Sequence, residues 1–255
     1  KVGNSVYGGG EIASVGKYGL DDDEMPEVLV FGGTCIVNVQ GSATIGSSGT
    51  GNVFGAGKGV VPHFDKDNDI KSERSRRMTL YTNATDFPTS AMLPATGTPT
   101  GTTPKGSTWE YTDATHTYVW EYFQSEEKYK KYLETLALAT HPEVTIDGSA
   151  IVNGSVFGGG ELGLTKGSVV VNIQGGTIME DVYGGGSLAD TKTTKDVAKR
   201  ENGKTLPPDS NGKYETEEVS PTTTVNLLGG KIVHDAYGGG LGDDTHAPKV
   251  KGDVL

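Results

Sequence analysis

Apolar and polar positions alternate in two short runs within residues 168–186. Glycines separate the two runs, and three consecutive glycines close the segment. Alternation with a period of two, bounded by glycine, predicts two short β-strands with a turn after each. The apolar members are Val169, Val171 and Ile173 in the first run and Ile178 and Val182 in the second.

This pattern recurs along the chain. An aliphatic residue, an aromatic residue, glycine, a small residue and glycine follow one another at residues 6–10, 53–57, 156–160, 182–186 and 236–240. Matching first strands with their glycine turn occupy residues 37–41, 144–148, 171–175 and 225–229. The shortest spacing between the aromatic positions, from Phe157 to Tyr183, is 26 residues. A unit of this size cannot bury its own apolar face, so the copies are expected to stack on one another.

The repeated unit has too many glycines, and the wrong apolar spacing, for a helical repeat. The sequence therefore predicts an all-β fold, a parallel β-helix (β-solenoid) with inserted loops and a small α+β excursion. Like strands in such a stack lie about 4.8 Å apart, so equivalent residues lie over one another. The expected interior rows are Val37, Val144, Val171 and Val225, and beside them Val39, Ile146, Ile173 and Leu227.

Residues 1–57 and 143–255 are predicted to form the stack, and residues 58–142 an inserted subdomain. Aromatic residues alternate with polar ones around Trp109 and Trp120, which indicates a hairpin, and a helix is predicted over 125–140. Residues 187–221 are charged and turn-rich, with hairpin tips at 202–203 and 211–212. Because insertions follow the glycine corner, they are expected to emerge from one side, often the working side of such a stack. The ends of the chain fall within repeats, which predicts a piece of a longer repeat chain.

The composition of the chain limits which kinds of partner it can bind. With 33 acidic and 22 basic residues, the net charge of −11 argues against a nucleic acid or an anionic membrane surface as partner. No apolar run is long enough to span a membrane, so no membrane insertion is predicted for this segment. Cys35 is the only cysteine, which excludes a disulfide within the chain, and it aligns with an interior position. We interpret it as a small buried hydrophobe.

Two acidic segments are candidate Ca²⁺ sites. The first has carboxylates at alternating positions, as a tight loop around a hard cation requires, but it lacks the glycine and the final glutamate of an EF-hand. The second resembles half of a calcium-binding nonapeptide repeat and occurs once. A solvated acidic loop is the alternative for both segments, and it is the favoured interpretation. The candidate ligands are Asp65, Asp67, Asp69 and Glu73 in the first segment and Asp243 and Asp244 in the second.

The aromatic residues of the five motifs form a predicted row. If the row faces solvent, its rings suit sugar rings or apolar groups of a partner; if it faces inward, it is a core stack whose hydroxyl groups need partners. A row of Asn38, Asn172 and Asn226 predicts an amide ladder between repeats. The aromatic row, our candidate ligand site, comprises Tyr7, Phe54, Phe157, Tyr183 and Tyr237.

No catalytic residue is predicted. Glu11 and Glu161 follow the glycine corner in two repeats, but the equivalent positions elsewhere hold Lys58, Ser187 and Leu241. Enzymes need unlike groups that converge on one place, and no nucleophile elbow, phosphate loop, zinc spacing or triad signature is present. An enzyme is therefore less favoured than a binding or structural protein.

Tyrosine–triple-glycine corners that follow strands of the type V-N-I-Q-G-G resemble long repetitive surface proteins of gut Bacteroidetes, and also the β-helical passenger regions of bacterial adhesins. The resemblance implies an extracellular or cell-surface protein with a structural or adhesive role. It would bind a glycan, or a surface protein of a host or bacterium, through projecting loops. The alternatives are a polysaccharide lyase or glycoside hydrolase of the β-helix type, and a passive stalk or spacer.

Overall fold

The computed structural model describes residues 1–20, 25–60, 76–80, 98–103, 106–112, 117–123, 126–192, 197–217, 219, 221–244 and 247–255. The chain divides into two compact units, one of Lys1–Val60 with Glu134–Leu255 and the other of Val61–Leu133. The described part is nearly all β, with one α-helix, α1 (Glu126–Thr135). The predicted all-β fold with parallel strands is confirmed.

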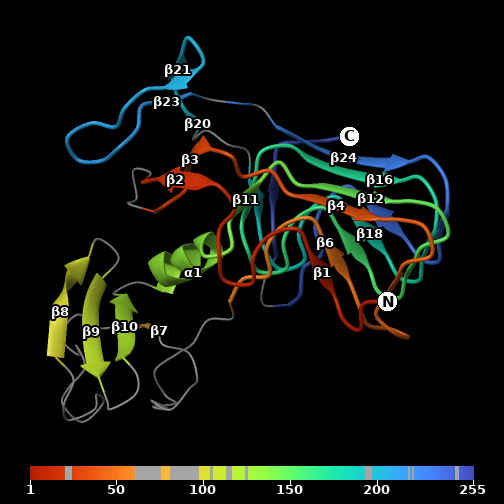
Figure 1. The fold of residues 1–255 in the computed structure, drawn as a ribbon, viewed down its shortest axis with the longest axis horizontal. Helices are drawn as coiled ribbons and strands as arrows, with labels where there is room; N and C mark the ends of the chain where they lie inside the picture. Colours follow the sequence, from red (N-terminus) through yellow and green to blue (C-terminus); the bar gives the residue numbers. More distant parts are fainter. Residues whose placement is uncertain are drawn as a thin grey trace. The chain divides into compact units, whose positions relative to one another are not determined.

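Four parallel sheets make up most of the first unit, and successive sequence repeats add neighbouring strands to each of them (Figure 1). The longest strands form one five-stranded sheet, the long-strand sheet. It consists of β4 (Ile36–Val39), β12 (Glu143–Ile146), β16 (Val169–Ile173), β24 (Thr222–Leu227) and β28 (Asp253–Val254). The aromatic motif forms a second five-stranded sheet, the aromatic sheet. It consists of β1 (Val6–Tyr7), β6 (Val53–Phe54), β14 (Val156–Phe157), β18 (Val182–Tyr183) and β26 (Ala236–Tyr237).

Two four-stranded sheets complete the set. The isoleucine sheet contains β5 (Thr44–Ile45), β13 (Ile151–Val152), β17 (Thr177–Ile178) and β25 (Lys231–Ile232). The threonine–lysine sheet contains β11 (Ala139–Thr140), β15 (Thr165–Lys166), β19 (Thr191–Lys192) and β27 (Val250–Lys251). We number the repeats by their strand in the aromatic sheet, so that repeat 1 contains β1, repeat 4 contains β18 and repeat 5 contains β26.

Register along the long-strand sheet follows the predicted interior rows. Val144 pairs with Val37 on one side and Val171 on the other, and Val171 pairs with Val225. Val144 and Val171 have no exposed surface, and both belong to a continuous core of aliphatic side chains. Because strand residues alternate between faces, this register turns every second residue toward the core. Leu227 departs from the expectation, since it is 56% exposed at the end of its row.

The glycine corners allow the repeats to approach closely. A Cβ on Gly158 would lie 2.3 Å from the carbonyl oxygen of Gly184 and 2.5 Å from the Val169 side chain. Its φ lies outside the left-handed region, so space rather than backbone conformation requires glycine here.

Two excursions of the first unit build a separate mixed sheet, the side sheet, in the order β2 (Lys17–Gly19), β3 (Val28–Phe31), β20 (Val197–Ala198) and β23 (Thr216–Glu217). Val28, Val30 and Ala198 form its core. Within residues 1–57, the assignment of Val28–Phe31 to the stack is wrong, because the apolar β3 pairs with β20 from the second excursion. The predicted hairpin tip at Asn202 and Gly203 is confirmed, and it joins β21 (Arg200–Glu201) to β22 (Lys204–Thr205).

The unit Val61–Leu133 contains β7 (Arg76–Leu80), β8 (Thr98–Thr103), β9 (Gly106–Thr112) and β10 (Thr117–Phe123). β9 and β10 pair antiparallel, as the predicted hairpin requires. The helix ends at Thr135 rather than at residue 140. Ala139 and Thr140 instead pair with Thr165 and Lys166, so the backbone bonds of the threonine–lysine sheet replace helical ones there.

Candidate functional site

The five predicted aromatic residues form one stacked ladder. The ring centroids of successive residues lie 4.8–5.1 Å apart, and their planes differ by 5–13°. Phe54 and Phe157 are 2% exposed and Tyr183 is 6% exposed, whereas Tyr237 is 46% exposed. Each of the three buried rings has a ring above and a ring below it, so its faces cannot take a sugar ring. The aromatic row is a core stack along most of its length, which is the inward-facing alternative of the two that the sequence left open.

The tyrosine hydroxyl groups of the ladder donate hydrogen bonds to carboxylates. Tyr183 donates to Asp181 at 3.1 Å, and Tyr237 donates to Asp235 at 3.2 Å. Burial, reinforced by the bond to Asp181, raises the pKa of Tyr183 to about 12. The Tyr7 hydroxyl donates to Glu161, and burial followed by this bond raises its pKa as well. These phenols therefore stay neutral and position the rings.

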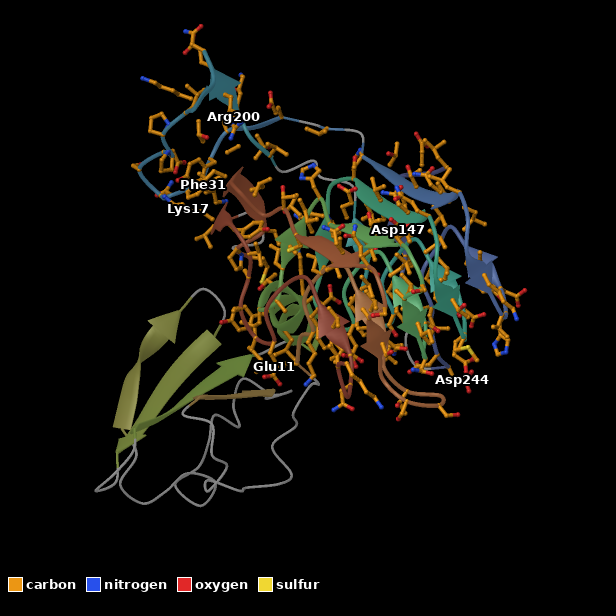
Figure 2. All side chains as sticks on the ribbon, turned by 45° about the vertical axis from the view of Figure 1, so that its right-hand side comes forward. Glu11, Lys17, Phe31, Asp147, Arg200 and Asp244 are labelled. Carbon is orange, nitrogen blue, oxygen red and sulfur yellow. The ribbon has the colours of Figure 1, made fainter. Side chains whose placement is uncertain are left out.

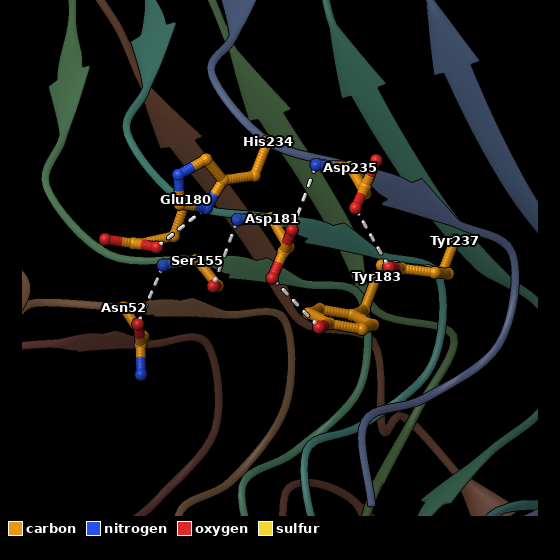
Figure 3. Close-up of polar contacts among 8 residues, drawn as sticks. All are labelled: Asn52, Ser155, Glu180, Asp181, Tyr183, His234, Asp235 and Tyr237. Atoms are coloured by element: carbon orange, nitrogen blue, oxygen red, sulfur yellow. Dashed lines mark hydrogen bonds and ion pairs between the residues drawn. The ribbon is translucent and has the colours of Figure 1, made fainter.

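A column of short polar residues lies two positions before each aromatic residue and links successive repeats. The Ser5 hydroxyl accepts the backbone N–H of Asn52 at 3.0 Å, and the Asn52 side chain accepts that of Ser155 at 2.8 Å. Figure 3 shows the column from Asn52 to the end of the stack. Asp181 continues it by accepting the N–H of Asp235 at 3.0 Å. We call this set the polar column: Ser5, Asn52, Ser155, Asp181 and Asp235. Sequence reasoning missed it, although serine, asparagine or aspartate occupies the position in all five motifs.

His234 and Glu180 lie beside the end of the polar column (Figure 3). The imidazole Nδ1 of His234 lies 3.0 Å from a Glu180 carboxylate oxygen, and both side chains are solvent-exposed. No group of three or more histidine, cysteine or acidic residues in the described chain could hold a metal ion. Asp243 and Asp244 are thus not part of such a group, and the predicted calcium ligands Asp65, Asp67, Asp69 and Glu73 lie outside the described residues.

The asparagine row forms part of an amide ladder. The Asn226 side chain donates to Asn172 Oδ1 at 2.8 Å, and Asn172 donates to Glu143 at 3.2 Å. Thr145 separates Asn38 from Asn172 in the register, so the ladder is interrupted there.

The two glutamates that follow the glycine corner do not form a catalytic pair. The Lys58 Nζ lies 3.0 Å from Glu11, while Glu161 accepts the Tyr7 hydroxyl. Lys58 lies between the two along the stack, since Gly59 bonds to the Glu11 carbonyl and Leu162 to the Lys58 carbonyl. Acid and base groups with a shared reaction site would need to converge. Here each carboxylate has a different neighbour.

Cys35 is a buried part of the core, 3% exposed, in a cluster with Ala56 and Ala139. Burial raises the pKa of its thiol, which keeps it protonated and unreactive. Its predicted role as a small buried hydrophobe is confirmed.

A buried ion pair joins the first excursion to the stack. The Lys166 Nζ lies 2.9 Å from a Glu27 carboxylate oxygen and donates to the Glu27 carbonyl at 3.2 Å. The side chains are 1% and 4% exposed. Tyr18 of β2 adds a second link through its hydroxyl, 2.8 Å from Thr140, and burial raises its pKa to about 12. The side sheet is thereby held against the threonine–lysine sheet.

Comparison with protein families, curated proteins and solved structures finds no match to this chain. Within the described residues, no helix has the length and apolar character needed to cross a membrane.

Proposed function

We propose that the chain is a segment of an extracellular or cell-surface β-solenoid with a structural and adhesive role. The observation that carries the proposal is the in-register parallel pairing of equivalent residues through successive repeats, as in Val37, Val144, Val171 and Val225. Pairing of each repeat with its nearest neighbours can be extended by adding repeats, which suits a stalk. The resemblance to repetitive surface proteins of gut Bacteroidetes supports the same role.

We assign adhesion to the segments inserted between the repeats, because the aliphatic and aromatic side chains of the repeats are buried against one another. The side sheet is firmly anchored by Lys166 and Glu27, yet it presents Phe31 with 59% of its surface exposed. Figure 2 shows Lys17 and Phe31 at this sheet, and Arg200 on the β21–β22 hairpin that follows β20 along the chain. Loops on a rigid scaffold are favourable places for recognition. A glycan or a surface protein would bind here or at the unit Val61–Leu133.

The two alternative functions, a polysaccharide-processing enzyme and a passive spacer, require different arrangements of side chains. A polysaccharide lyase or glycoside hydrolase needs carboxylates, or bases from neighbouring repeats, that face a common groove. Lys58 lies between Glu11 and Glu161 along the stack, so these two carboxylates do not form the pair that such an enzyme needs. This arrangement therefore favours adhesion over the enzyme. A passive spacer would need only the stack and would bind nothing through its excursions.

Binding of the whole chain to a printed glycan array and to immobilised mucin tests the adhesive role. Three chains are compared: the natural sequence, an Arg200→Glu/Lys204→Glu variant of the β21–β22 hairpin in the second excursion, and a Lys231→Glu control on the stack. A second comparison replaces residues 61–133 by a glycine–serine linker. Adhesion predicts binding that falls at least about tenfold in the hairpin variant or the linker variant and persists in the control. Absence of binding by the natural chain, or release of reducing sugar from polysaccharides, would overturn it.

A further inference from the structure

Two of the ion pairs in the first unit have nearly the same length but opposite surroundings. The Lys58 Nζ lies 3.0 Å from a Glu11 carboxylate oxygen, and these side chains are 42% and 58% exposed. The Lys166 Nζ lies 2.9 Å from a Glu27 carboxylate oxygen, and these side chains are 1% and 4% exposed. The two pairs therefore differ in solvent access rather than in the distance between their charged groups.

Buried residues adjoin both members of the second pair. Met25 and Val28, which lie within two residues of Glu27 along the chain, are each 1% exposed. Thr140, the register partner of Lys166 in the threonine–lysine sheet, has no exposed surface. Removing two charges from water costs free energy that their mutual attraction can fail to offset. A reaction that removes both charges is therefore more favourable in this pair than in the exposed one.

Hydrogen bonds hold the two groups of the buried pair in place. The Lys166 Nζ donates to the Glu27 backbone carbonyl at 3.2 Å, in addition to its contact with the carboxylate. The Glu27 N–H donates to the Met25 carbonyl at 2.8 Å. The Lys166 carbonyl accepts the N–H of His141 at 2.9 Å, and strand β15, which carries Lys166, pairs with β11 on one side and β19 on the other. The amine and the carboxyl group are thus kept in contact by the backbone on both sides.

Two groups that are held in contact react as if they were highly concentrated. Well-oriented intramolecular reactions reach effective molarities of about 10⁵–10⁸ M. Condensation of an amine with a carboxylic acid releases water, so bulk water opposes it and a high effective concentration favours it. A pair that is in contact and also excluded from water, such as Lys166 and Glu27, meets both conditions.

We propose that Lys166 and Glu27 join in a covalent amide cross-link. A proton passes from the Lys166 ammonium group to Glu27 Oε2, which gives a neutral amine and a carboxylic acid. The Nζ lone pair then attacks Glu27 Cδ and forms the new N–C bond. The Cδ–Oε2 bond breaks, and Oε2 leaves as water with the proton that it received and a second proton from Nζ. The reaction needs no oxidant, reductant or further reactant.

The cross-link ties the side sheet to the stack. Glu27 directly precedes β3 of the side sheet, and Lys166 lies in the threonine–lysine sheet, 139 residues further along the chain. A covalent bond between such distant positions restricts the unfolded chain and raises the melting temperature, as a disulfide does. Lys58 and Glu11, which are in contact but solvated, are expected to remain an ion pair. The inference concerns the scaffold and is independent of the adhesive role.

Intact-mass spectrometry of the denatured chain tests the cross-link, because denaturant separates an ion pair but not an amide. The natural chain, kept folded before it is denatured, should weigh about 18 Da less than its sequence requires. Lys166→Arg keeps the positive charge but provides no nucleophilic amine, so it should show the full sequence mass. Lys58→Arg, the matched control in the exposed pair, should retain the loss of about 18 Da.

Tryptic peptide mapping locates the bond. Trypsin cuts after lysine and arginine, so a chain without the cross-link gives separate peptides 18–58, 132–166 and 167–192. The amide blocks cleavage after Lys166, so the natural chain should instead give peptide 18–58 joined to peptide 132–192. A natural chain with the full sequence mass would overturn the inference and leave an ion pair only. A loss of water that persists in Lys166→Arg, or a bond between Lys58 and Glu11, would overturn it as well.

Discussion

Repeats 4 and 5 have nearly the same sequence pattern and pair with each other in register, yet they differ in burial. Val182 and Ile173 of repeat 4 have no exposed surface, while the equivalent Ala236 and Leu227 of repeat 5 are exposed. The difference is positional, because repeat 4 has a complete neighbour on each side and repeat 5 has one complete neighbour. Burial of a residue here depends on the adjacent repeat more than on its own, as in other stacked repeat proteins.

The aromatic ladder gives the largest expected contrast between the two repeat environments. Phe157→Ala removes a ring that is stacked on both faces and should lower the free energy of unfolding by about 3–5 kcal/mol. Tyr237→Ala removes a ring stacked on one face and should cost about 1 kcal/mol. Urea denaturation followed by circular dichroism in dilute solution compares them. Equal losses of unfolding free energy in the two variants would contradict the proposed difference between buried and terminal repeats.

The aliphatic rows give the next contrast. Ile173→Ala opens a cavity in the core and should lower the free energy of unfolding by about 2–5 kcal/mol. Leu227→Ala, at the equivalent position of repeat 5, should change it by about 0.5 kcal/mol or less, since its side chain is 56% exposed. The same denaturation experiment applies. A loss at Leu227 as large as that at Ile173 would mean that another part of the chain covers repeat 5.

The polar column should show the same difference between repeats 4 and 5, with smaller changes in the free energy of unfolding. Asp181→Ala removes acceptors for both the Asp235 N–H and the Tyr183 hydroxyl, and should cost about 1–2 kcal/mol of unfolding free energy. Asp235→Ala removes the acceptor for the Tyr237 hydroxyl alone, and should cost about 0.5 kcal/mol. Asp181→Asn keeps an acceptor and serves as the control. The ordering of the three variants is the result to check.

Alkaline titration gives the smallest of these effects. The folded-state pKa of Tyr183, about 12, lies above its ordinary value of 10.0, so folding stabilises the neutral phenol. This contribution is fully present below pH 10 and is lost as the pH rises toward 12. Tyr183 and Tyr18 both titrate near pH 12 in the folded chain, so phenolate absorbance should show a component there that Tyr183→Phe reduces by the contribution of one tyrosine. A Tyr183 that titrates near pH 10 in the folded chain would contradict the assigned burial and hydrogen bond.

The regular repeats could be predicted from the sequence because their signals are local. Period-two alternation decides which face of Val144 and Val171 turns inward, and equal spacing to the glycine turn sets their register. The exposure of Leu227 could not be predicted in this way, because it depends on whether a complete neighbouring repeat covers the strand. The polar column was predictable in principle, since a short polar residue stands before every motif.

Long-range pairing explains most of what the sequence could not predict. The apolar run at Val28 has the composition of a stack strand, but it pairs with β20, which lies far along the chain. The buried pair of Lys166 and Glu27 joins residues that no local pattern relates. The helix prediction failed near Thr140 for a similar reason, because a sheet partner overrides helical propensity there.

The most direct test of the in-register parallel stack is disulfide formation between chosen repeats. In a Cys35→Ala background, Asn172→Cys is combined either with Asn226→Cys, its register partner, or with Thr224→Cys, two residues out of register. Register partners lie about 4.8 Å apart, within the range for a disulfide, and the shifted pair lies too far apart. The account predicts that mild oxidation links Cys residues at 172 and 226, seen by peptide mapping without reduction, and leaves the shifted pair free. Faster closure of the shifted pair would contradict it.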